Sequence, residues 1–286
     1  MNRVLKQIIV CSLFLFGWHS LFAAEYALYL NRDTATVNGQ LIHSSAFNWT
    51  EEWSMQNAIL TGDVDEELVV TVFNLDTVDH TFTIEGVVEV DNLILAQSSA
   101  EFTFQINSAG TFRYYSDRPE GKLLGASGHL LIGYQDYSCF YWNLFDLEHE
   151  LTAQIGLGEI SEIPVDYKPE LFFINGLFFP ETLEDPFGYV SGTVGEEIII
   201  SIVNSGNMDH ILHFHGYHIE ILEAKRIPNM IGWSKDSLPV KQNEALTLLL
   251  VPNQTGVYPV HDHNLISVTN VGFYPGGMIT HLNITE

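Results

Sequence analysis

The chain has 286 residues, 46% of them hydrophobic, and its 36 acidic residues against 11 basic ones give a formal net charge of −25 at pH 7. A surface this acidic repels nucleic acid and anionic membranes and attracts cations, so we expect no nucleic-acid partner. The length fits either one large domain or two ordinary ones.

Residues 1–24 read as an export signal. Arg3 and Lys6 precede an apolar run over residues 8–16, and small residues follow near position 24. This order is typical of a secretory signal peptide. No later apolar run approaches the roughly 20 residues that a membrane-spanning helix needs. The sequence therefore predicts a periplasmic or secreted protein without a membrane span.

The few cysteines indicate that the hydrophobic core, and not a disulfide, stabilises the fold. Cys11 would leave with the signal peptide, so Cys139 would be the lone thiol of the exported chain. A lone thiol excludes an intramolecular disulfide.

An internal repeat organises the rest of the chain. Residues 65–86 align without gaps on residues 195–216, and each segment reads as a β-branched run, a turn and a second alternating strand. The identical pairs are Glu66/Glu196, Glu67/Glu197, Asn74/Asn204, Asp79/Asp209, His80/His210 and Gly86/Gly216. The repeat predicts an all-β protein of two Greek-key β-sandwich domains in tandem. Their predicted bounds are 25–135 and 169–286, with a linker over 136–168 whose structure the sequence leaves open.

Histidines are concentrated in the second unit. His213 and His215 are two residues apart, and so are His261 and His263. Side chains two apart on a strand point to the same face, so two adjacent strands would present four imidazoles together. Imidazole suits copper, zinc, iron or nickel. The pattern therefore predicts a metal site in the second unit.

The same motifs resemble those of cupredoxin domains. The second unit is similar to the last domain of multicopper oxidases at the histidine-rich strand 210–216, and to copper nitrite reductase over residues 256–266. The closing segment from Gly277 to Ile284 also resembles the last cupredoxin strand. The resemblance covers nearly the whole chain after the signal peptide. It implies that copper is the metal.

The sequence departs from the resemblance at the blue-copper (type 1) position. Such a site uses two histidines, a cysteine thiolate and usually a methionine. Ser116 and Asp262 stand in the cysteine position, and Met278 keeps the methionine only in the second unit. His80 and His210 remain as the early histidines, and His210 could pair with Asp262 in place of a lost metal. We therefore expect no blue copper in either domain.

The resemblance also implies a second copper centre between domains. His213, His215, His261 and His263 would form one half of it, in a homotrimer that joins the second domain of one subunit to the first domain of the next. Water or the carboxylates Glu85 and Asp117 of the first domain would complete the site. Carboxylate ligands would shift the preference toward zinc, iron or manganese. The less secure metal candidates are His210, Asp262, Met278, Glu85, Asp117 and His80.

Three functions remain open at this level. The first is a copper-dependent oxidoreductase that acts on a small-molecule oxidant or reductant. The second is a non-catalytic protein that binds or sequesters copper. The third is a degenerate cupredoxin with a structural role, which the altered first domain favours and the four retained histidines of the second domain oppose.

Overall fold

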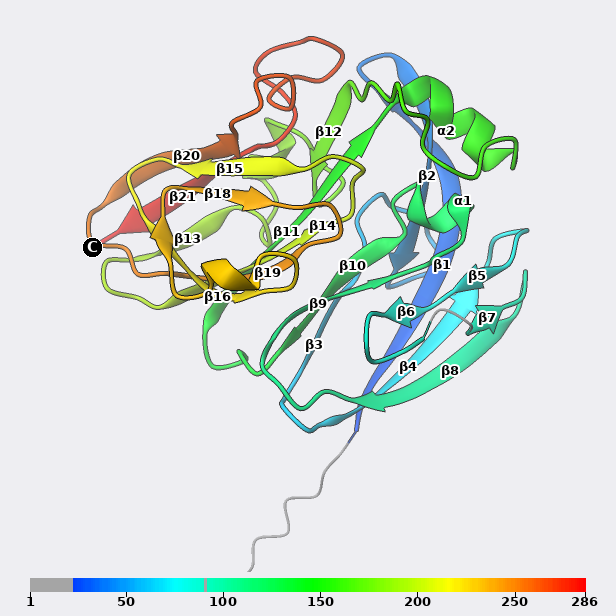
Figure 1. Ribbon diagram of the computed structural model, residues 1–286, viewed down its shortest axis with the longest axis horizontal. Coiled ribbons are helices and arrows are strands. Elements are labelled where there is room, and N and C mark those ends of the chain that lie inside the picture. Colours follow the sequence, from blue (N-terminus) through cyan, green and yellow to red (C-terminus); the bar gives the residue numbers. More distant parts are fainter. Residues whose placement is uncertain (1–22, 90–91) are drawn as a thin grey trace, which may run out of the picture.

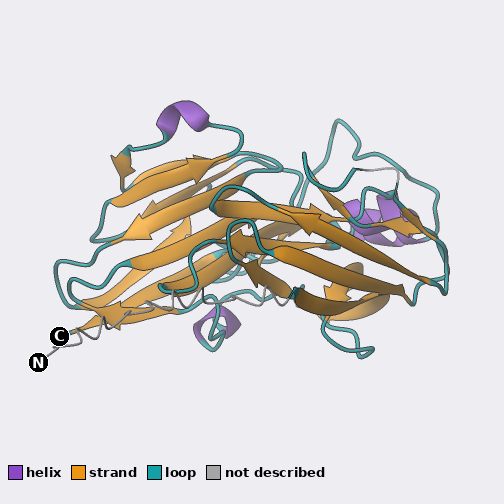
Figure 2. Ribbon diagram, turned by 90° about the horizontal axis from the view of Figure 1, so that it is seen from below, coloured by secondary structure: helices purple, strands orange, loops and turns teal. Residues whose placement is uncertain are grey.

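The computed structural model describes residues 23–89 and 92–286, so almost all of the predicted signal peptide lies outside the described residues. Two β-sandwiches lie side by side (Figure 1), and short helices lie at the periphery of the strand-built body (Figure 2). Within the described ranges, no helix is long and apolar enough to cross a membrane. The predicted all-β, two-sandwich architecture is confirmed.

The first sandwich contains two four-stranded sheets and a two-stranded ribbon. Their strand orders are β2-β1-β4-β8, β3-β10-β9-β6 and β5-β7. The elements are β1 (Ala24–Val37), β2 (Gln40–Asn48), β3 (Ile59–Gly62), β4 (Glu67–Asn74), β5 (His80–Thr81), β6 (Thr83–Ile84), β7 (Leu93–Ile94), β8 (Ser99–Gln105), β9 (Gly110–Tyr115), α1 (Pro119–Lys122) and β10 (Ser127–Ile132).

The second sandwich contains a six-stranded and a five-stranded sheet. Their orders are β12-β11-β14-β19-β16-β17 and β13-β21-β20-β15-β18. The elements are β11 (Ser138–Leu147), α2 (His149–Gly156), β12 (Leu171–Ile174), η1 (Glu181–Leu183), β13 (Val190–Thr193), β14 (Ile198–Asn204), β15 (His210–Phe214), β16 (Ile219–Ala224), η2 (Pro228–Met230), β17 (Ser234–Lys235), β18 (Ser237–Val240), β19 (Ala245–Leu250), β20 (Gly256–Asp262) and β21 (Ile279–Thr285).

The stretch 136–168 supplies regular structure to the second sandwich. Its strand β11 pairs in parallel with β14, from Ser138 opposite Ile198 to Leu144 opposite Asn204. Helix α2 follows. The second sandwich therefore receives its first strand from the segment that the sequence left open.

The repeat is visible in equivalent hydrogen bonds. Asn74 Nδ2 donates to Val78 O at 2.9 Å, and Asn204 Nδ2 donates to Met208 O at 2.8 Å. Each Asn Oδ1 also accepts from the backbone N–H two residues later. The two asparagines thus satisfy the same turn after equivalent strands, which is why both units retain them.

The repeated strands β4 and β14 differ in their surroundings. Strand β4 alternates between buried and partly exposed residues, whereas every residue of β14 is buried. One face of β14 joins the core of its own sandwich, and Ile199 on the other face packs with Leu131 and Tyr141. The first domain covers the second face, so apolar residues occur at consecutive positions.

Polar contacts also join the two sandwiches. Thr111 of β9 donates its backbone N–H to Thr247 Oγ1 at 2.8 Å and its hydroxyl to Ser201 Oγ at 2.9 Å. All three side chains are buried. Because buried hydroxyls without partners cost free energy, these bonds fix the domains against each other.

Candidate metal centre

Strands β15 and β20 carry the four predicted histidines side by side. The antiparallel register sets His213 directly opposite His261. Beyond these partners, the His215 N–H donates to Pro259 O at 3.1 Å, and the His263 N–H donates to Ile211 O at 2.7 Å. The period of two along each strand therefore places all four imidazoles on one face.

The rings form a continuous cluster. The ring centroids of His213 lie 4.7 Å from His215 and 5.7 Å from both His261 and His263. The centroids of His215 and His261 are 5.2 Å apart, and their Nε2 atoms are 3.1 Å apart. Two nitrogens bound to one ion at about 2.0–2.1 Å, as in zinc sites, lie about 2.9–3.4 Å apart. The His215–His261 pair has the spacing of two ligands of one ion.

Neighbouring groups orient two of the rings, and for His261 they leave Nε2 free to bind a metal. The Nδ1 atom of His213 is 2.8 Å from Ser237 Oγ, and Nδ1 of His261 is 2.9 Å from Asp262 O. A carbonyl oxygen only accepts, so the His261 Nδ1–H donates and its Nε2 keeps the lone pair. Burial, together with repulsion from His213 and His261, lowers the pKa of His215. The neutral imidazole that a metal requires is thereby favoured.

The four rings of the described chain are close together but do not share one ion position in this arrangement. Among residues 23–89 and 92–286, no three His, Cys, Asp or Glu side chains converge closely enough to hold an ion as they stand. Two Nε2 atoms are correctly spaced, while the other two rings of the cluster lie next to them. The donors fit a metal that prefers imidazole.

Two hollows flank the cluster. One, of about 320 Å³, is lined by His215, His261 and His281, together with the exposed side chains of Leu265 and Tyr274. The other, of about 270 Å³, lies on the His213 side and includes His218. His281 was not among the predicted ligands, but it adjoins the cluster because β21 pairs with β20. His281 is far from His261 in the sequence, so the sequence alone did not indicate that the two lie close together.

His80 and His210 occupy equivalent buried positions away from this cluster. His80 Nδ1 is 3.0 Å from Ser116 Oγ, and His210 Nδ1 donates to Asp262 Oδ2 at 2.7 Å. Both rings are fully buried. Ser116 and Asp262 therefore bond the early histidine of their own domain.

An acidic residue on the far side of each ring completes these networks. His80 Nε2 donates to Asp76 Oδ2 at 3.0 Å, whereas His210 Nε2 is 3.5 Å from Asp146 Oδ2, too far for a well-formed hydrogen bond. Burial alone would lower the pKa of His210, but the nearby carboxylates of Asp146 and Asp262, the second of which it bonds, raise it to about 9. The two carboxylates therefore favour the protonated form of the buried His210 ring.

Asp146 was not among the site residues predicted from the sequence. It lies in β11, which was read as linker, and Tyr167 donates to its Oδ1 at 2.7 Å. Asp146 Oδ2 accepts the backbone N–H groups of Asn207 and Met208. A single carboxylate in the otherwise uncharged run 138–147 was the available signal, because a buried charge needs partners.

The remaining candidates have other partners. Glu85 forms an ion pair with Arg226 at 2.7 Å, and Asp117 forms one with Lys122 at 3.3 Å. Neither has a hydrogen bond or ion pair to the four clustered histidines within the described chain. Met278 is fully buried in the core of the second sandwich.

The thiol of Cys139 lies apart from the histidine cluster and from the His80 and His210 networks. Its Sγ lies 3.2 Å from Tyr134 O, near the start of β11. Burial raises the pKa of this thiol to about 11, so it stays protonated at neutral pH.

A known protein family matches part of the sequence of this chain. A family model described as multicopper oxidase matches residues 180–274, a segment that contains all four histidines. No curated protein matches the sequence significantly.

Several solved structures share the fold. A multicopper oxidase, mgLAC, has a TM-score of 0.75 at 19% identity, covering 92% of this chain and 86% of its own. A blue copper oxidase from Nitrosomonas europaea has a TM-score of 0.74 at 19% identity, with the same coverages. A copper nitrite reductase from Nitrosomonas europaea has a TM-score of 0.69 at 14% identity, covering 93% of this chain and 95% of its own. The chain therefore has the two-domain fold of these multicopper oxidases and copper nitrite reductases, and residues 180–274 match the multicopper oxidase family model.

Proposed function

We propose that this protein is an exported, copper-binding oxidoreductase that acts on a small oxidant or reductant at a site shared between copies of the chain. The observation that carries the proposal is the 3.1 Å separation of the His215 and His261 Nε2 atoms within a cluster of four imidazoles. Bound copper would supply one-electron redox chemistry there. The protein would orient two of the imidazoles through Ser237 and the Asp262 carbonyl.

A neighbouring copy of the chain supplies the missing ligands in this proposal. The side chains of Leu265 and Tyr274, which lie beside the cluster, are each 74% exposed. Large apolar side chains exposed next to an incomplete polar site favour a contact surface. In a closed ring of three copies, each copy buries this surface against the next copy.

Glu85 and Asp117 of the neighbouring copy are the candidate ligands from the first domain. Their ion pairs with Arg226 and Lys122 are exposed, so each contributes at most about 1 kcal/mol. Either carboxylate is therefore available to a metal at small cost.

Both early histidines support a protein without blue copper. Ser116 and Asp262 bond His80 and His210, and a Cβ atom on Gly121 would come within 2.5 Å of Ser116 Oγ. The buried space around Ser116 is thus filled by protein atoms. Electrons would then reach the histidine cluster directly from a substrate or partner.

The first test measures copper content and the electron paramagnetic resonance spectrum of purified protein, first stripped and then titrated with copper. About one copper per chain, without a strong absorption near 600 nm, is expected for an imidazole site that lacks thiolate. His261→Ala should lose this copper. His218→Ala, an exposed histidine of the same region, should retain it and is the matched control.

Two further measurements separate the proposal from its alternatives. Analytical ultracentrifugation should show a trimer. The proposal does not require the His261→Ala variant to lose this trimer. Steady consumption of dioxygen or nitrite in the presence of an artificial reductant would support the proposed oxidoreductase activity. Tight copper binding without turnover would instead leave copper sequestration, and equal copper content in His261→Ala would remove the site.

A further inference from the structure

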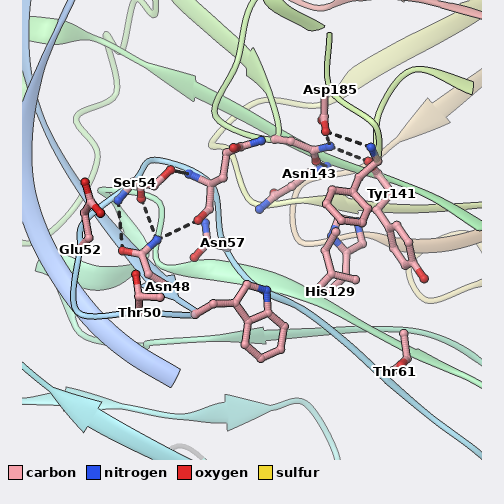
Figure 3. A pocket seen from close by; sticks show the side chains of 15 residues that line it. Asn48, Thr50, Glu52, Ser54, Asn57, Thr61, His129, Tyr141, Asn143 and Asp185 are labelled. Atoms are coloured by element: carbon pink, nitrogen blue, oxygen red, sulfur yellow. Dashed lines mark hydrogen bonds between the residues drawn. The ribbon is translucent and has the colours of Figure 1, made fainter. Parts of the chain in front are cut away.

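A second cavity lies between the two domains and shares no lining residue with the histidine cluster. It has a volume of about 450 Å³, within the range of small-molecule sites. The connection between β2 and β3, together with His129 of β10, lines it from the first domain, and Tyr141 and Asn143 of β11 line it from the second. Figure 3 shows Asn48, Ser54 and Asn57 along one side and His129 and Tyr141 along the other.

Two buried polar atoms of this wall lack hydrogen-bond partners. His129 is 2% exposed and Asn143 is 7% exposed, and neither His129 Nε2 nor Asn143 Oδ1 has a partner with good hydrogen-bond geometry, although the backbone of Trp142 and Ser201 lies near the His129 ring. Asn143 is otherwise well held, because its Nδ2 donates to Ser127 O at 2.6 Å and its N–H donates to Asn175 Oδ1 at 2.8 Å. Unpaired buried polar atoms are costly, so a ligand that bonds them gains that free energy.

The chemistry of the wall restricts the ligand. Lys and Arg are absent from the residues that line this cavity, and burial lowers the pKa of His129 to about 3, so its ring is neutral. Anions therefore find no charge partner. Two carboxylates, Glu52 and Asp185, line the cavity, and Asp185 already accepts Asn175 Nδ2 at 2.7 Å and the Phe187 N–H at 3.0 Å. Carboxylate oxygens can also accept hydrogen bonds from the hydroxyl groups of a ligand.

Aromatic rings and amides make up much of the remaining surface. Trp49 and Phe187 are about half exposed, at 48% and 51%. Flat aromatic faces beside amide and hydroxyl groups suit a ligand with apolar C–H faces and several hydroxyls. A hydroxyl also both donates and accepts, so one such group can donate to Asn143 Oδ1 and another can bond His129 Nε2.

We propose that this interdomain cavity binds a small neutral polyhydroxylated molecule, of the size and chemistry of a sugar. The ligand would lie against Trp49 and direct hydroxyls to His129 and Asn143. The site depends on the packing of β10 against β11, and it is independent of any metal at the histidine cluster.

The test uses the full chain as purified. D-Glucose, D-galactose, D-mannose, sucrose and trehalose are screened by saturation-transfer difference nuclear magnetic resonance, and any binder is titrated by calorimetry. Choline and citrate serve as the cationic and anionic probes. We expect saturable binding of at least one sugar and of neither charged probe.

Matched variants locate the binding. Trp49→Ala should weaken the sugar about tenfold, corresponding to the loss of one aromatic face. Trp233→Ala removes an indole of similar exposure from the other domain, 49% against 48%, and should leave the affinity unchanged. His129→Phe should weaken it as well, with circular dichroism checking that each variant folds.

Four results would overturn the proposal. They are the absence of saturable sugar binding, equal binding of a charged probe, equal effects of the two tryptophan variants, and a crystal structure grown with the sugar that shows only ordered water at His129 Nε2 and Asn143 Oδ1.

Discussion

His210 donates a hydrogen bond of 2.7 Å to Asp262, at positions equivalent to those where His80 and Ser116 lie 3.0 Å apart in the first domain. The two domains thus use the same pair of sites for buried side-chain hydrogen bonds. In the second domain the pair is ionic, because Asp146 and Asp262 raise the pKa of His210 against the effect of burial. Removing Asp262 would leave His210 without its hydrogen bond and with only the more distant carboxylate of Asp146.

Asp262→Ala should therefore be strongly destabilising. Breaking a buried ion pair costs about 3–5 kcal/mol, since the remaining charge has lost its compensation. Urea unfolding in the presence of a chelator measures this without a metal contribution. Asp209→Ala removes the exposed carboxylate paired with Lys241 and should cost less than about 1 kcal/mol. Similar losses in both variants would contradict the assignment of a buried ionic pair.

Substitutions in the histidine cluster and at Ser116 should have different effects on metal binding. His215→Ala or His263→Ala should abolish tight metal binding, whereas Ser116→Ala should retain it, because Ser116 bonds His80 and not the cluster. Metal analysis after dialysis measures the content of all three. Equal content in all three variants would mean that the metal is bound elsewhere.

Glu85→Gln tests whether a first-domain carboxylate reaches the metal of a neighbouring copy. We expect weaker copper binding, with a change in unfolding free energy below about 1 kcal/mol, because the Glu85–Arg226 pair is exposed. Arg226→Gln breaks the same ion pair but keeps the carboxylate, so it should not weaken copper binding. Unchanged copper affinity in Glu85→Gln would remove this residue from the site.

His129 should make stability depend on pH. Its pKa is lowered by burial to about 3 in the folded state and is about 6.5 in an unfolded chain. The unfolded chain therefore binds the proton first, and stability falls as the pH drops from about 6.5 toward 3. The loss at pH 5.5 is about 1.4 kcal/mol relative to pH 7.5.

His129→Gln should lack this component, since glutamine does not titrate. Urea unfolding of both proteins at pH 7.5 and 5.5 gives the difference. The pH at which the carboxylates titrate lies lower, so they contribute little over this interval. Parallel losses in the two proteins would show that His129 is not buried in its neutral form.

The all-β fold, the repeat and the shared face of the four histidines were predictable from sequence. Strand periodicity is local, so His213 and His215 share a face whatever surrounds them, and the same holds for His261 and His263. The gap-free match of residues 65–86 to 195–216 likewise needs only the order of residues. Equivalent hydrogen bonds at Asn74 and Asn204 confirm it.

Only the tertiary structure decided which distant groups meet. Asp146 reaches His210 because β11 joins the sheet of the second domain, and β11 lies in a segment whose structure the sequence left open. The complete burial of β14 likewise depends on the first domain covering its second face. The spacing of the His215 and His261 nitrogens follows from strand register and ring orientation. These features depend on contacts between segments far apart in the chain, which residue order alone does not specify.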